Sequence, residues 1–127
     1  MRKSYSQNLF VYGSLMREEV IKRYINRVPE SEEAILRGWS RIFDPTFRPY
    51  PFLVKDASGK VNGLCYFDLR DEEIKKLDKY ESCEHDLYRR EKVVVEVKTD
   101  ETTEEVQAEV YVGGILEEEY QRQLKEE

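Results

Sequence analysis

The sequence is poor in the residues that bind metals or form covalent cross-links. It contains one histidine, His85, and two cysteines, Cys65 and Cys83. A single histidine argues against a metal site, and two thiols allow at most one disulfide, which a reducing compartment would not favour. We therefore expect no bound metal and two free thiols.

Long apolar runs and an excess of positive charge are also lacking. No run of about 18 apolar residues is present, and residues 1–7 lack the apolar stretch of a secretory signal. The 21 basic and 27 acidic residues give a formal net charge of -6 and form no basic stripe, which argues against a nucleic-acid partner. These absences predict a cytoplasmic protein that binds neither membranes nor nucleic acid.

What is present suits a single folded domain. The chain has 127 residues, of which 39% are hydrophobic and 38% charged, so it can bury a core beneath an ionic surface. Residues 1–127 are expected to form one domain, with a core at about 8–112 and a charged, helical C-terminal extension at 115–127.

Apolar periodicity predicts an α+β fold with a mostly antiparallel sheet that is strongly bent or closed. Gly13 ends the first strand, and Ser14 is the expected N-cap of the first helix. Residues 56–60 read as a turn, so the strands on either side of it should form a hairpin. Strands are expected at 8–12, 34–43, 50–54, 61–68, 92–98 and 106–112, and helices at 16–26 and 71–81.

Glu81 is the first candidate for chemistry. Ile74 and Leu77 lie on one stripe of the predicted second helix, and residue 81 continues that stripe. The carboxylate should therefore lean inward near the helix C-terminus, where the macrodipole disfavours an anion. Such a group is a candidate acid or base because desolvation raises its pKa. The alternative is that Glu81 turns to the surface and pairs with Arg89 or Arg90.

The segment Tyr12, Gly13, Ser14 and Leu15 is the second candidate. Gly13 permits a close backbone approach, and successive N–H groups at a helix start can bind an anion or an oxyanion. The segment lacks the second glycine of a dinucleotide fingerprint and the lysine of a phosphate loop. Strand-to-helix turns with Gly and Ser are common, so without family information a purely structural turn is the favoured interpretation.

A nucleophilic site would need His85 as a base for Cys83 or Ser14. Cys83 and His85 are two residues apart, which in a helical turn points their side chains in different directions. A small buried side chain is the simpler role for Cys83. Tyr88 either presents its hydroxyl to a pocket or packs at a strand start.

Three segments in order resemble the γ-glutamylcyclotransferase-like family, and their spacing is most similar to its AIG2-like, γ-glutamylaminecyclotransferase branch. The resemblance covers about residues 8–112, whereas the segment after Gly114 has no clear counterpart and the stretch 84–86 is unusually polar. The segments are Phe10-Val11-Tyr12-Gly13-Ser14-Leu15, Tyr50-Pro51-Phe52-Leu53, and residues 77–83 followed by Leu87-Tyr88-Arg89-Arg90.

The resemblance implies a small mixed β-barrel flanked by helices, with a cavity between the 12–15 loop and an acidic residue. It implies that this loop binds the glutamyl end of a small-molecule substrate through its backbone. Glu81 would be the general acid/base, with Tyr50 and Tyr88 lining the pocket.

The implied reaction releases 5-oxoproline and a free amine from a γ-glutamyl amine or γ-glutamyl amino acid. It needs no cofactor, because the substrate's own α-amine attacks its γ-carbonyl. The alternative is a non-catalytic domain that uses the same cavity to bind a small ligand or a protein. The sequence leaves the leaving amine and the oligomeric state, monomer or dimer, open.

Overall fold

The computed structural model describes residues 7–42, 52–80 and 89–112, together with Arg122. Tyr50, Glu81, Cys83, His85 and Tyr88 lie outside these residues, as does the C-terminal extension apart from Arg122. Among the helices that are described, none is long and apolar enough to cross a membrane.

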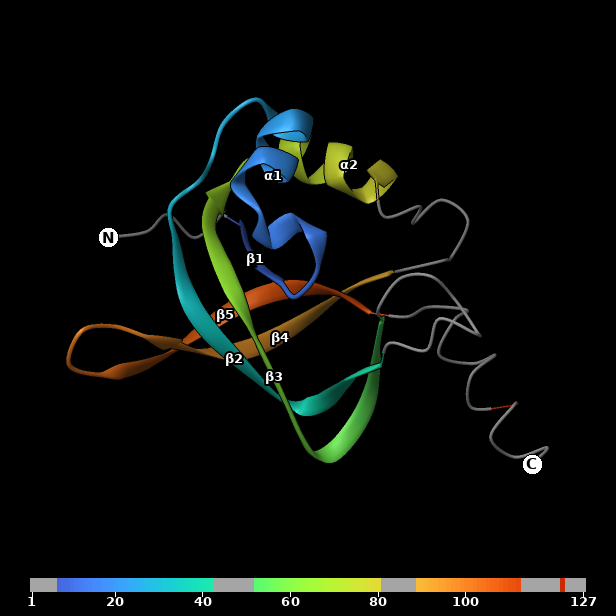
Figure 1. The fold of residues 1–127 in the computed structure, drawn as a ribbon, viewed down its shortest axis with the longest axis vertical. Coiled ribbons are helices and arrows are strands. Elements are labelled where there is room, and N and C mark those ends of the chain that lie inside the picture. Colours follow the sequence, from blue (N-terminus) through green and yellow to red (C-terminus); the bar gives the residue numbers. More distant parts are fainter. Residues whose placement is uncertain (1–6, 43–51, 81–88, 113–121, 123–127) are drawn as a thin grey trace.

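Five strands close into a barrel in the order β1-β3-β2-β4-β5 (Figure 1). Neighbouring strands are antiparallel, except that β1 and β5 pair in parallel and so complete the barrel. The expected mixed, mostly antiparallel barrel with flanking helices is confirmed. The elements are β1 (Gln7–Val11), a 3₁₀ turn η1 (Ser14–Met16), α1 (Glu18–Ile25), β2 (Ser31–Ile42), β3 (Phe52–Leu69), α2 (Asp71–Tyr80), β4 (Arg89–Lys98) and β5 (Thr103–Val112).

The core has two layers, and β1 contributes side chains to both. Phe10 packs inside the barrel with Trp39 and Val110. Leu9 and Val11 face the other way and join a layer that includes residues of α1 and α2. The two helices lie together against one side of the barrel (Figure 1). Ile74 and Leu77 of α2 are buried in that outer layer, as their spacing predicts.

The expected hairpin at 56–60 is wrong. β3 runs without interruption from Phe52 to Leu69 and pairs with β2 along both halves. Residues 56–59 form a bulge opposite Gly38, which has a φ of +89°, so both strands bend together (Figure 1). A Cβ on Gly59 would lie 2.3 Å from the carbonyl oxygen of Trp39. Glycine at this position therefore allows β2 and β3 to approach closely at the bulge.

The start of the first helix also differs from the prediction. Ser14 begins the 3₁₀ turn, and α1 starts only at Glu18 with Arg17 as its N-cap residue. The side chain of Ser14 therefore does not cap α1. Asn26 ends the helix in a left-handed conformation, with φ of 63°.

A buried ion pair joins α2 to the segment after α1. Glu73 is 5% exposed, and Arg27 donates to its two oxygens at 2.6 and 2.7 Å. The backbone N–H of Arg70 donates to the same carboxylate at 2.9 Å. Burial opposes ionisation, but these hydrogen bonds outweigh it and hold the pKa of Glu73 below its ordinary value. The first turn of α2 is thereby fixed.

Candidate functional site

The predicted binding loop connects β1 to α1 through a short, tight turn. The backbone N–H of Met16 donates to the carbonyl of Gly13 at 3.0 Å, and that of Arg17 donates to the carbonyl of Ser14 at 3.1 Å. Leu15 points into the outer core layer and is 3% exposed. The loop is therefore held by its own backbone and by one apolar anchor.

Two tyrosine hydroxyls fix the loop from either side. Tyr66 of β3 donates to the carbonyl of Leu15 at 2.8 Å, and Tyr12 donates to the carbonyl of Tyr111 at 2.6 Å. Burial, together with the negative charge of Glu18, raises the pKa of Tyr66, so this hydroxyl stays a neutral donor. The structure thus presets the backbone of the loop before any ligand arrives.

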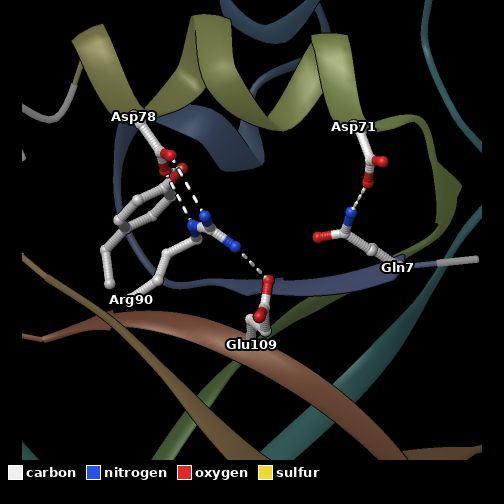
Figure 2. A network of polar contacts seen from close by, with 6 residues as sticks. Gln7, Asp71, Asp78, Arg90 and Glu109 are labelled. Atoms are coloured by element: carbon white, nitrogen blue, oxygen red, sulfur yellow. Dashed lines mark hydrogen bonds and ion pairs between the residues drawn. The ribbon is translucent and has the colours of Figure 1, made fainter.

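The last turn of α2 is held to the barrel by Arg90 of β4 (Figure 2). Its Nε and Nη2 donate to the two oxygens of Asp78 at 2.8 and 3.1 Å, and its Nη1 donates to Glu109 of β5 at 2.5 Å. Burial opposes the charge of Arg90, but the two carboxylates raise its pKa above the ordinary value. The guanidinium therefore remains a cation between two partly buried acids.

Tyr111 joins the loop to this helix end. Its hydroxyl donates to Asp78 at 2.7 Å, while its carbonyl accepts the hydrogen bond from Tyr12. The side chain is buried in the same core layer as Leu15 and Leu77. One residue of β5 therefore contacts both the predicted loop and the helix that precedes Glu81.

The predicted site residues divide into two groups. Tyr12, Gly13, Ser14 and Leu15 are described and form one continuous loop. The other three, Tyr50, Glu81 and Tyr88, lie outside the described residues, so their roles stay predictions. The described part of α2 runs to Tyr80, directly before Glu81. Arg90, offered as a surface partner for Glu81, binds Asp78 and Glu109 among the described residues.

Sequence reasoning missed Tyr66, Asp78 and the role of Tyr111. Tyr111 alternates with the apolar residues Val110 and Val112 of β5, and it packs in the core layer that includes residues of α1 and α2. Tyr111 is 3% exposed. Its size and its single polar atom were the only signal, because a buried tyrosine hydroxyl needs a partner.

Within the described parts of the chain, no three His, Cys, Asp or Glu side chains are grouped to hold a metal ion. Asp78 and Glu109 both bind the Arg90 guanidinium. The polar groups that are described here suit hydrogen bonding and orientation.

A model of the family described as gamma-glutamyl cyclotransferase, AIG2-like, matches residues 9–127. The chain belongs to this family. The match extends to residue 127, so it includes the C-terminal segment that the short motifs left outside. This chain is 42% identical over 105 residues to AIG2-like protein C of Arabidopsis thaliana, a match that covers 83% of the chain and 58% of that relative.

The chain is also similar to other AIG2-like and cyclotransferase proteins. A gamma-glutamylcyclotransferase and putative RNase of Methanocaldococcus jannaschii is 36% identical over 71% of this chain and 40% of its own. A solution structure from Arabidopsis thaliana has a TM-score of 0.73 at 30% identity, covering 99% of this chain and 79% of the other. A crystal structure of an AIG2-like protein from Mus musculus, at 21% identity, shares the fold with a TM-score of 0.69 over 84% of this chain and 76% of that one.

The chain spans about three fifths of the length of the first curated relatives it matches, at 58% and 66%. Family membership and fold follow from these likenesses. The activity, substrates and partners of the whole protein are matters for proposal.

Proposed function

We propose that this AIG2-like chain is a γ-glutamyl cyclotransferase that acts on a γ-glutamyl amine or γ-glutamyl amino acid. The products are 5-oxoproline and a free amine. The Tyr12 to Leu15 loop binds the glutamyl end through its backbone, Tyr50 and Tyr88 line the pocket, and Glu81 is the general acid/base.

The reaction is an intramolecular transfer that makes modest demands on the protein. The α-amine nitrogen of the substrate bonds to its own γ-carbonyl carbon, and the bond from that carbon to the leaving nitrogen breaks. Glu81 accepts a proton from the α-ammonium group and returns it to the leaving nitrogen. Backbone N–H groups of the loop stabilise the oxyanion that forms on the carbonyl.

The observation that carries the proposal is the meeting of the loop and the α2 end at Tyr111. Its carbonyl accepts from Tyr12 and its hydroxyl donates to Asp78. Glu81 follows the described part of α2 directly in the sequence, so the helix end that leads to the predicted acid/base is joined to the predicted binding loop. Family membership supports the same assignment, since a relative carries the cyclotransferase name.

Measuring 5-oxoproline released from γ-glutamyl amines, γ-glutamyl dipeptides and glutathione tests the proposal. Glu81→Gln should lower turnover by about 10² to 10⁴ because it removes the proton acceptor while keeping the side-chain shape. Glu72→Gln is the matched control: it makes the same change on α2, where the Glu72 side chain is 73% exposed.

Retained 5-oxoproline release by a folded Glu81→Gln variant would contradict this mechanism. Saturable binding of the same compounds without any 5-oxoproline from wild type would instead support the non-catalytic binding domain. Loss of activity in Cys83→Ser with retention in Glu81→Gln would indicate a thiol hydrolase.

A further inference from the structure

Asp78 is the centre of a hydrogen-bond cluster that joins one helix, α2, to two strands, β4 and β5. It accepts two hydrogen bonds from Arg90 and one from the hydroxyl of Tyr111. The exposed fractions of the Asp78 and Arg90 side chains are 24% and 29%, and that of Glu109 is 19%. Partial burial limits competition from water, so the cluster holds its geometry better than an exposed pair would.

Other contacts also hold α2 onto the fold. Ile74 and Leu77 already bury the helix, and Arg27 binds Glu73 near its first turn. At the other side of that first turn, Gln7 of β1 donates to Asp71 (Figure 2). Asp78 also sits in the last turn, where the helix macrodipole disfavours an anion. Its carboxylate therefore suits a task specific to that end of the helix.

We propose that Asp78, oriented by Arg90 and Tyr111, is a positioning residue for Glu81, the acid/base of the proposed reaction. Asp78 precedes Glu81 by less than one helical turn of sequence. Tyr111 supplies the reference point because its carbonyl is fixed by Tyr12 at the start of the loop. The inference rests on the proposed cyclotransferase function.

The physical basis is the sensitivity of general acid/base catalysis to distance. A proton acceptor must lie within hydrogen-bond reach of the substrate, and a misplacement of about 1 Å can cost roughly 10²-fold in rate. Binding of the glutamyl end relies on the loop, which is held separately by Tyr66. Loss of the Asp78 cluster should therefore lower kcat and leave KM nearly unchanged.

The first arm of the test measures 5-oxoproline kinetics in Asp78→Ala. Alanine keeps the helix but removes all three acceptor contacts, so we expect kcat to fall about tenfold to a hundredfold with KM within about twofold. Glu73→Gln is the matched control, since it weakens an ion pair near the opposite end of the same helix. Its kcat per folded molecule should stay within about twofold of wild type.

The second arm asks whether Tyr111 acts through Asp78. Tyr111→Phe removes only the hydroxyl and keeps the backbone carbonyl that Tyr12 binds. It should lower kcat about threefold to tenfold in the wild-type background and have no further effect in Asp78→Ala, because residues that act as a unit are not additive. This variant is also mild enough to fold if Asp78→Ala is not.

The outcomes separate this inference from the proposed function. If Glu81→Gln is inactive but folded Asp78→Ala or Tyr111→Phe keeps the wild-type kcat, the positioning role is overturned and the proposed cyclotransferase function is not. A loss that matched the unfolded fraction, or additive effects of the two substitutions, would also overturn it. Retained activity in folded Glu81→Gln would overturn both.

Discussion

The first and last turns of α2 are each held by an arginine, but the two ion pairs differ in what else they touch. Glu73 is 5% exposed, and its carboxylate accepts hydrogen bonds from the Arg27 side chain and the backbone N–H of Arg70. Both donors lie close to the two helices in sequence. Asp78 is less buried and shares Arg90 with Glu109. Through Tyr111 it also reaches the loop at Tyr12.

The difference teaches that similar chemistry can serve stability at one end of a helix and geometry at the other. A closed set of contacts, such as that of Glu73, affects chiefly the free energy of unfolding. A set that reaches the predicted binding loop, such as that of Asp78, is the one proposed to affect where a neighbouring residue lies. The two ends can therefore be separated by measuring stability and turnover on the same variants.

The largest effect on stability is expected for Glu73→Gln. It should lower the free energy of unfolding by about 3 kcal/mol, because it removes one charge of a largely buried ion pair; Arg27 is partly exposed, which keeps the cost at the low end. Urea unfolding followed by circular dichroism measures this loss. A fall in kcat per folded molecule would break the proposed contrast between the two ends.

Acidification should reproduce part of this effect without a mutation. The pKa of Glu73 is lowered in the folded state, so its contribution is full above the ordinary Glu pKa of about 4.3 and is lost as pH falls through the folded-state value. The stability gap between wild type and Glu73→Gln should therefore narrow below about pH 4. Urea titrations at pH 7 and at pH 3.5 test this, and a constant gap would contradict it.

A smaller effect is expected on the loop side of the site. Tyr66→Phe removes the hydrogen bond to the carbonyl of Leu15 and should cost about 1 kcal/mol of stability. KM should rise more than kcat falls, the reverse of the pattern expected for Asp78→Ala, because the proposed role of the loop is to bind the glutamyl end. A change in kcat alone would show that loop and helix end are not separable in this way.

The smallest effect is expected for the second tie near the first turn of α2. Gln7→Ala removes the hydrogen bond to Asp71, an exposed residue, and should change stability by no more than about 0.5 kcal/mol. Turnover should not change. A loss as large as that of Glu73→Gln would mean that the exposed contact, not the buried ion pair, secures this end.

Local pattern was enough to predict most of the fold. Alternation along β4 and β5 and the Ile74 and Leu77 stripe gave the right elements, since burial of one face follows from short-range periodicity. The prediction of a hairpin at 56–60 was wrong because these residues form a bulge opposite Gly38 of β2, and their own composition does not reveal that partner. Composition alone does not distinguish a turn from a bulge.

The site was predictable only in part for the same reason. The Tyr12 to Leu15 loop is one continuous segment, so it could be proposed as a unit from the sequence. The contacts of Asp78 with Arg90 and Tyr111 join residues from α2, β4 and β5, and these meet only because the barrel closes. No spacing rule within one element can reveal such a pairing.

Closure of the barrel also has a consequence for the order of folding. Phe10 of β1 pairs with Val110 of β5, so the closing seam joins opposite ends of the described chain and makes a contact of high sequence separation, which is slow to form. During synthesis, β1 must wait as an open edge until β5 has emerged from the ribosome. The hydrogen bond from Tyr12 to Tyr111 cannot exist before then, so this contact between the Tyr12 to Leu15 loop and β5 forms among the last folding events of a nascent chain.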